Sequence, residues 1–292
     1  MPAFAPSASA LRVRAALLLV AAPIIAALSS ACASSGGARL PAPLDTLRMV
    51  REVPVEWKSG SATLKGTLFV PPGGGAHPAV VMVHASGAET RAANHDLALA
   101  FANAGVAALA YDKRGAGLST GDLATASFAD LAADAAYGAA AIRQNSAVDG
   151  NRVGVYAHGQ GATMSPMIAE RDATIQFIVA VGPTGVETDS LDRWRYDADA
   201  HWRSVNGPVM LVWGANDKRV PVEKSKELIR GALKRDQARA QLTCEYPGAD
   251  ERLMVSGTLS PDFVRDVTRW VRVATRLEAA PPAGQGYSAA CR

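Results

Sequence analysis

The sequence predicts an α/β domain built on a doubly wound, mostly parallel sheet with helices on both faces. From about residue 50 onward, short apolar runs of strand length alternate with longer segments of helical periodicity. Turn-forming residues separate the two kinds of segment, and such alternation requires right-handed crossovers that cover both faces of a parallel sheet. The first two strand-like segments follow one another directly and predict an antiparallel hairpin at the N-terminal side.

The predicted elements follow in a regular order. Strands are expected where apolar residues run on or alternate over a short stretch, and helices where they recur at the spacing of one helix face. The predicted strands cover residues 53–60, 62–71, 79–84, 106–112, 152–157, 175–182, 208–214 and 240–248. The predicted helices cover residues 93–105, 127–145, 221–236 and 260–276.

The first 31 residues are predicted to be a signal peptide. Two arginines precede an apolar run over residues 15–28, which has the length of a secretory core and is shorter than the roughly 20 residues that span a bilayer. The following "LSSAC" resembles a bacterial lipoprotein signal, which implies a lipid on Cys32, a flexible linker over 32–49 and the periplasmic face of a membrane. Ordinary cleavage after Ala33 is the alternative, and it also predicts export.

Charge and composition exclude some partners. Without its signal peptide the chain loses two arginines and no acid, which leaves 28 basic and 27 acidic side chains and a formal charge of +1. No basic run is interleaved with aromatic residues, so no nucleic-acid partner is expected. No cofactor-binding or metal-binding motif is found, and neither a cofactor nor a metal is predicted.

The cysteines leave two readings of the C-terminus open. Cys244 and Cys291 can pair in an oxidising compartment, which would join a core strand to the tail. In the other reading Cys244 is a buried free thiol. The tail over residues 277–292 is rich in Pro, Gly and Ala, which predicts a loose segment.

Four motifs occur in the order in which the α/β-hydrolase family has them. They are "VHASG" at 83–87, "YDKRGAGLSTGD" at 111–122, "AHGQG" at 157–161 and "VWGANDKRVP" at 212–221. Over residues 50–276 the chain resembles this family, and most closely the dienelactone-hydrolase and prolyl-oligopeptidase-like esterases. The resemblance implies a sheet of the α/β-hydrolase type, with a short insertion near 184–206.

The resemblance also implies a triad in which two positions are replaced. Asp217 stands at the position of the triad acid, Gly159 at that of the nucleophile, and Glu251 at that of the general-base histidine. A triad works because an imidazole oriented by a carboxylate deprotonates a hydroxyl, and glycine offers no atom to attack with. Glycine also enters the strained corner of a nucleophile elbow freely. The chain is therefore expected to be a pseudoenzyme.

The oxyanion hole of the family is made of backbone N–H groups, which do not depend on side chains. The matching donors are those of Gln160 and of Ser86 or Ala85. These groups predict that the pocket still binds a carbonyl or a carboxylate at a helix N-terminus.

Three functional classes remain. The first is an exported, lipid-anchored binding module for a small molecule, an acyl or peptide ligand, or a partner. The second is an active esterase or peptidase that uses other residues, for which His201, in the insertion, is the histidine that could reach the pocket. The third is an acidic site of Asp217 and Glu251, beside Asp250, that binds a cation or an amine.

Overall fold

The computed structural model describes residues 49–186, 196–233, 241–282 and 284–292. The predicted signal peptide, Cys32 and nearly all of the linker lie outside the described residues. Within the described part of the chain, no helix has the length and apolar character needed to cross a membrane.

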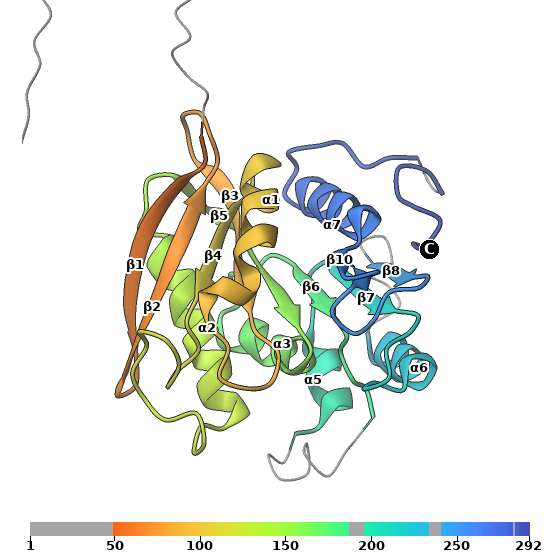
Figure 1. Ribbon diagram of the computed structural model, residues 1–292, viewed down its shortest axis with the longest axis horizontal. Helices are drawn as coiled ribbons and strands as arrows, with labels where there is room; N and C mark the ends of the chain where they lie inside the picture. Colours follow the sequence, from red (N-terminus) through yellow and green to blue (C-terminus); the bar gives the residue numbers. More distant parts are fainter. Residues whose placement is uncertain (1–48, 187–195, 234–240, 283) are drawn as a thin grey trace, which may run out of the picture. The chain divides into compact units, whose positions relative to one another are not determined.

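An eight-stranded sheet forms the centre of the domain (Figure 1). Its strands are β1 (Arg51–Ser59), β2 (Ala62–Val70), β3 (His77–Val83), β4 (Ala107–Tyr111), β5 (Val148–His158), β6 (Ile178–Val181), β7 (Val209–Gly214) and β8 (Gln241–Tyr246). They lie in the order β1-β2-β4-β3-β5-β6-β7-β8. Only the β1–β2 and β2–β4 pairs are antiparallel, so the predicted hairpin and the mostly parallel sheet are confirmed.

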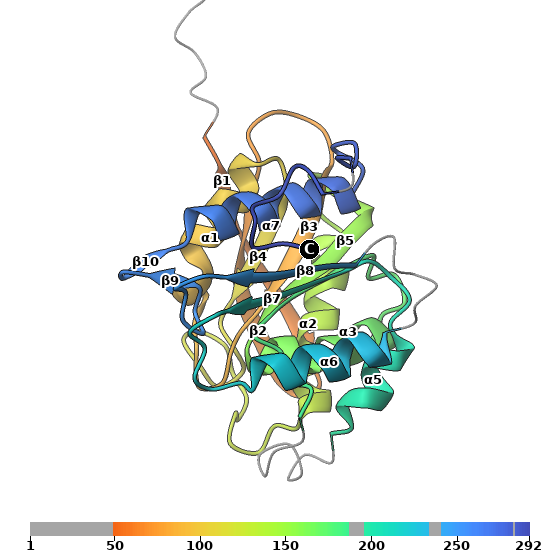
Figure 2. The same cartoon turned by 90° about the vertical axis from the view of Figure 1, so that its right-hand side faces the viewer.

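Helices cover both faces of this sheet. They are η1 (Arg91–Asn94), α1 (His95–Asn103), α2 (Phe128–Ile142), α3 (Gln160–Arg171), α5 (Ala198–Ser204), α6 (Val222–Ala232) and α7 (Pro261–Ala274). Helices α1 and α7 pack on one face, and α2, α3, α5 and α6 lie on the other (Figure 2). A separate two-stranded antiparallel sheet follows β8 and consists of β9 (Met254–Val255) and β10 (Thr258–Leu259).

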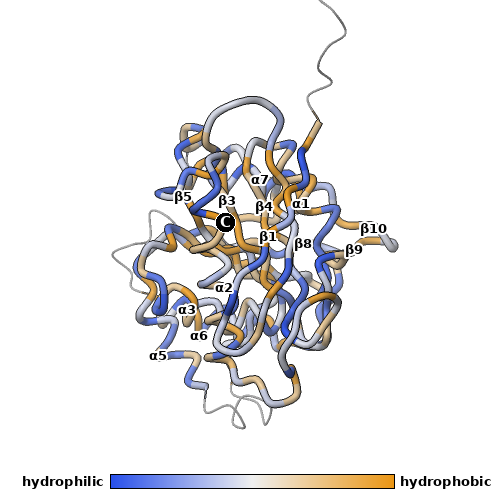
Figure 3. Tube along the Cα trace, turned by 90° about the vertical axis from the view of Figure 1, so that its left-hand side faces the viewer, coloured by the Kyte–Doolittle hydropathy of each residue, from blue (hydrophilic) through white to orange (hydrophobic). Residues whose placement is uncertain are grey.

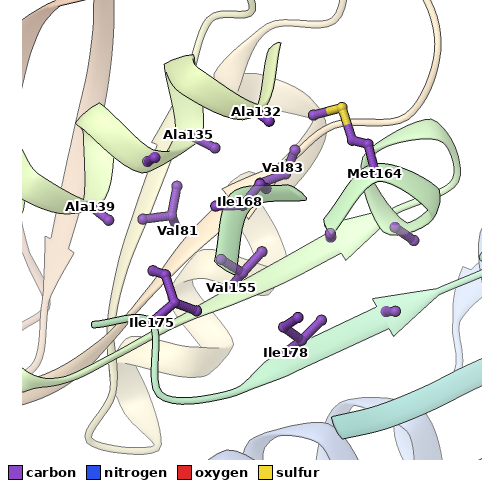
Figure 4. Packing of buried hydrophobic residues seen from close by; sticks show 14 of the residues in the cluster. Val81, Val83, Ala132, Ala135, Ala139, Val155, Met164, Ile168, Ile175 and Ile178 are labelled. Carbon is purple, nitrogen blue, oxygen red and sulfur yellow. The ribbon is translucent and has the colours of Figure 1, made fainter. Parts of the chain in front are cut away.

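The two cores follow from the alternation of side chains along the strands. In β3, Val81 and Val83 join the core under α2 and α3, whereas Val80 and Met82 join the core under α1 and α7. The α2 helix presents alanines to the core that contains Val81 and Val83, and these small side chains let the helix approach the sheet closely (Figure 4). Hydrophobic residues concentrate along the strands in the middle of the fold (Figure 3).

Two helices begin at capping residues that the sequence displays. Ser127 and Asp130 form a capping box at the start of α2, in which each side chain accepts the backbone N–H of the other residue. Ser260 caps α7 by accepting the Phe263 N–H, and Pro261 occupies the first turn, where its missing N–H costs nothing. These local signals place both helices in the register that buries their apolar faces.

The C-terminal tail is tied to the sheet, although its composition predicts a loose segment. Cys244 and Cys291 form a disulfide, which decides between the two readings of the cysteines. Arg292 and Thr243 exchange two backbone hydrogen bonds along the open edge of β8. The buried carboxylate of Asp266 accepts hydrogen bonds from the backbone and the hydroxyl of Ser288. Composition misses these long-range contacts because it reports only local preference.

Replacing Cys291 by serine should lower the free energy of unfolding by about 2 to 4 kcal/mol, because the disulfide closes a loop of 47 residues in the unfolded chain. Urea unfolding of wild type and variant measures the difference. Dithiothreitol should remove it, since both proteins are then without the bond. Two freely alkylated thiols in unreduced wild-type protein would show that the disulfide does not form.

Candidate functional site

A one-residue corner joins β5 to α3 at the carboxyl end of the parallel sheet. Gly159 forms it, with φ of 53° and ψ of −114°. Its N–H donates to the carbonyl oxygen of Val181 at 2.8 Å, which fixes the corner to the end of β6. A positive φ of this kind strains any residue with a side chain and leaves glycine unstrained. The sequence-predicted elbow is therefore present, with glycine at its apex.

A side chain at position 159 would meet the loop after β3. A Cβ atom placed on this residue would lie 3.2 Å from Ala85 Cβ and 3.6 Å from Ala85 Cα, with no other such neighbour within 4 Å among the described residues. A serine here would therefore fit after a shift of a few tenths of an ångström. Position 159 lacks a reactive atom because its residue is glycine. The neighbouring residues would not prevent a serine from occupying it.

The loop after β3 lies against the start of α3. The Gly161 N–H donates to the carbonyl oxygen of His84 at 3.0 Å and joins the two segments. Among the three predicted oxyanion donors, the Ala85 N–H already donates to a carboxylate oxygen of Glu89 at 3.0 Å. Ser86 is exposed, and Gln160 is the first residue of α3, so its N–H has no partner within the helix.

Asp217 follows β7 and has one free carboxylate oxygen. Its Oδ1 accepts the N–H groups of Arg219 at 2.8 Å and Val220 at 3.1 Å. Its Oδ2 is buried and has no hydrogen-bond partner among the residues that the structure describes. A Cβ on Gly182, which follows β6, would lie 3.7 Å from Oδ2. In a working triad the histidine would donate to this oxygen.

Glu251 lies in the loop after β8, and this loop reaches the elbow. The Nε2 of His158, the residue before Gly159, donates to the Glu251 carbonyl oxygen at 2.8 Å. The Glu251 carboxylate is 3.2 Å from Nε of Arg219. Since this carboxylate already has a cationic partner, the pair of Asp217 and Glu251 offers a poorer cation site than the sequence predicts. No group of three or more metal-ligating side chains occurs in the described part of the chain.

His201 does not lie over the elbow. Its Nδ1 is 2.9 Å from a carboxylate oxygen of Glu170, and its ring stacks on Tyr196. Glu170 is ten residues beyond Gln160 on α3, so the rise of an α-helix places it roughly 15 Å along the axis from the elbow. The histidine that the insertion offered therefore packs at the far end of α3.

The structure adds a residue that sequence reasoning missed. Lys113, two residues after the end of β4, is only 4% exposed, and its Nζ donates to the Ala85 carbonyl oxygen and to Oε1 of Gln160, both at 2.8 Å. It thus bridges the two segments that flank Gly159. Burial lowers the pKa of Lys113 to about 8, against the opposing influence of Glu89 and Asp134. The available signal was a lysine at the carboxyl end of a fully buried strand.

The charges on either side of Lys113 are paired. Asp112 receives the guanidinium of Arg91 at 2.7 Å, and these hydrogen bonds overcome the effect of burial and hold the pKa of Asp112 near 2. Arg114 binds Asp134 of α2 at 2.6 Å. Lys113 itself has no ion-pair partner within 4 Å in the described residues. It is a buried ammonium with neutral hydrogen-bond partners.

Comparisons with known proteins agree with the fold described above. A family model described as serine aminopeptidase, S33, matches residues 74–195, a range that includes the elbow and ends before Asp217. The structure of dienelactone hydrolase from Anabaena variabilis is 22% identical, with a TM-score of 0.61, and the match covers 76% of this chain and 97% of that one. No curated protein sequence matches the chain.

Two further solved structures share the fold at lower identity. The 2,6-dihydroxy-pseudo-oxynicotine hydrolase is 14% identical, with a TM-score of 0.65, covering 82% of this chain and 72% of that one. An esterase from Pyrococcus furiosus is 18% identical, with a TM-score of 0.62, covering 76% and 90%. Together with the strand order and the family model, these similarities show that the chain has the α/β-hydrolase fold.

The buried charge of Lys113 should appear in the pH dependence of stability. Its pKa is about 8 in the folded protein and near 10.4 in an unfolded chain, so the unfolded state binds the extra proton between these values. The stability of wild type relative to Lys113→Met should therefore rise from pH 8 to about pH 10.5, by up to about 3 kcal/mol.

Urea unfolding of both proteins at pH 7, 8.5 and 10 measures this difference. Lys224→Met, which removes an exposed lysine of α6, controls for the loss of one positive charge. A difference between wild type and Lys113→Met that stays constant over the range would contradict the assignment.

Proposed function

We propose that this protein is a catalytically inactive member of its fold family that binds a ligand with a carbonyl or carboxylate group at the β5–α3 corner. The observation that carries the proposal is Gly159, which holds the backbone conformation of the elbow without an attacking atom. Glu251, at the expected place of the base, is held by Arg219.

Binding remains feasible because the rest of the site does not depend on a nucleophile. The Gln160 and Ser86 N–H groups lie at the start of α3 and in the loop after β3, where unpaired donors favour a partly negative oxygen. Apart from its chain neighbours, Ala85 is the residue that a Cβ on Gly159 would meet within 4 Å in the described part of the chain. The similar structures are named as hydrolases and esterases, which supports an acyl compound or its acid as the ligand class.

An active serine enzyme is the competing candidate, and the arrangement of serines disfavours it. The hydroxyl of Ser165, six residues past the corner, is buried and donates to the Ala162 carbonyl oxygen at 2.8 Å. No serine hydroxyl bonds a histidine ring in the part of the chain that the structure describes. Without that bond a hydroxyl is a weak nucleophile at neutral pH.

Wild-type protein should not be labelled by a serine-reactive fluorophosphonate. The double variant Gly159→Ser, Glu251→His restores an attacking atom and a base near Asp217, and it should be labelled at residue 159. Gly159→Ser alone should react far more slowly, because triad members act as a unit. Intact-mass and peptide-mass analysis measure the labelling.

Gly159→Ala is the matched control, because it brings the same backbone strain of about 1 to 3 kcal/mol without a hydroxyl. A second control adds Asp217→Asn to the double variant, which should lose most of the labelling. Labelling of any serine in the wild type would overturn the proposed function and support the active enzyme.

The proposed place of action is the periplasmic face of a bacterial membrane. The observations behind it are the apolar run over residues 15–28 and the "LSSAC" sequence before the flexible segment. The disulfide between Cys244 and Cys291 fits an oxidising compartment.

Protein recovered from membranes should begin at Cys32, with the mass of a lipid modification on that residue. Cys32→Ala should abolish the added mass and shift the protein to the soluble fraction, because the anchor is lost. Soluble wild-type protein that begins at Ser34 would refute the lipid anchor and leave export intact.

A further inference from the structure

The chain enters the domain at the edge of the sheet opposite to the candidate site. Strand β1 begins at Arg51, which pairs with Val70, the last residue of β2. Because β2 runs antiparallel to β4, this end of the hairpin lies beside the start of β4. The parallel strands begin at this edge, which we call the amino edge (Figure 1). Gly159 and Asp217 instead follow the carboxyl ends of β5 and β7.

Segments far apart in the sequence meet at the amino edge. Arg272 of α7 donates to the Ala104 carbonyl oxygen, at the end of α1, at 2.6 Å. A Cβ on Gly105, shortly before β4, would lie 3.9 Å from a methyl carbon of Leu277. The loop over residues 71–76, between β2 and β3, lies at the same edge. The end of α7 is therefore beside the start of β4, and the start of β1 is two strand spacings from β4, about 10 Å.

Two of the large apolar side chains that the domain leaves exposed lie at this edge. Met49, two residues before β1, is 79% exposed, and Leu277, after α7, is 37% exposed. The loop over residues 73–76, Gly-Gly-Gly-Ala, is also exposed and carries no polar side chain. A single exposed apolar residue needs no explanation, whereas several of them beside a segment without polar side chains mark a contact surface.

The amino edge also carries an excess of positive charge. Arg51 and Arg276 are exposed, and neither has a carboxylate oxygen within 4 Å among the described residues. Glu278, the acid closest to Arg276 in the sequence, is shared by two arginines of α7 at 3.0 and 3.2 Å. Glu52 is exposed and reduces the excess without cancelling it. The edge is therefore suited to an anionic partner.

The predicted lipid indicates which partner lies against this edge. Residues 33–48 join Cys32 to Met49. A random coil of that length spans roughly 20 to 24 Å, about half the roughly 45 Å diameter of a domain of this size. The anchor therefore holds the amino edge near the bilayer. An anionic lipid surface attracts each arginine by roughly fivefold in affinity and takes up exposed apolar side chains.

We propose that Met49, Arg51, the 73–76 loop, Arg276 and Leu277 form a docking surface for an anionic phospholipid membrane. The inference rests on the lipid anchor of the proposed function and goes beyond it, because an anchor alone leaves the domain free to turn. Headgroup phosphates pair with the two arginines, and the two apolar side chains enter the layer between headgroups and acyl chains. The candidate site then faces away from the bilayer, and its ligand arrives from the aqueous side.

Amide hydrogen exchange of the mature, lipid-anchored protein tests the docking surface. The protein is reconstituted into anionic vesicles of phosphatidylethanolamine with phosphatidylglycerol, and into neutral vesicles of phosphatidylcholine. Residues 73–77 and 274–280 should exchange about tenfold more slowly in the anionic vesicles, because two arginines favour docking there. Residues 247–253, after the carboxyl end of β8, should exchange equally in both.

Arg51→Glu with Arg276→Glu should abolish the difference between the two kinds of vesicle. Arg276 has a φ of 58°, so a glutamate there bears the same backbone strain as the arginine. The matched control is Lys58→Glu with Arg230→Glu, which changes the net charge equally. Lys58 lies at the far end of β1 and Arg230 on α6, and both are exposed without a carboxylate partner within 4 Å in the described residues. The control should keep the slow exchange.

Equal exchange in the two kinds of vesicle, or slow exchange that the control loses as fully as the test variant, would overturn the docking surface. Failure of the anchor is a separate result, because the mature chain then lacks the mass of the lipid. In that case the unlipidated chain is mixed with the same vesicles at saturating lipid, and the exchange of residues 73–77 decides for or against the surface. Phosphonate labelling reports on the proposed loss of catalysis and does not affect this result.

Discussion

The left-handed backbone at Gly159 is the constraint on which the site depends. The chain must pass from the buried strand β5 to the helix α3 within one residue. The loop after β3 lies directly against that turn. A Cβ on Gly161 would be 2.6 Å from the His84 carbonyl oxygen, so only glycine lets the loop after β3 approach α3 this closely. Gly159 has a positive φ, which turns the chain from the direction of β5 into that of α3. Once both are met, the start of α3 faces the carboxyl ends of β3 and β4, where Ala85 and Lys113 lie.

Most of the fold was predictable because its determinants are local or periodic. The short apolar run over residues 79–83 is typical of a strand buried on both faces, and the Ser127 capping box marks the start of α2. The state of the tail was left open by the sequence, because Cys291 and Ser288 are held by residues 47 and 22 positions away. Composition carries no information about contacts at that distance.

The candidate site was predictable only in part. The order of the motifs located Gly159 and Gln160 after β5 and Asp217 after β7, and a parallel sheet brings these strand ends to one edge. Lys113 lies in the motif at 111–122 but was assigned no role, because charged residues next to strands are usually solvated. The surroundings of Lys113 depend on which neighbouring charges find partners, and the pairing of Arg91 with Asp112 and of Arg114 with Asp134 is seen only in the folded chain.

Asp217 shows why an aspartate at the expected position of the triad acid is weak evidence for catalysis. Its Oδ1 accepts two backbone N–H groups, two and three residues ahead, and so forms the turn that ends β7. This turn stabilises the loop whether or not an imidazole is present, so the fold alone gives a reason for an aspartate here. The oxygen that would orient the imidazole, Oδ2, is the one without a partner in the described structure. The turn that Oδ1 forms is thus complete, while Oδ2 has no partner among the described residues, as the proposed loss of the reacting groups predicts.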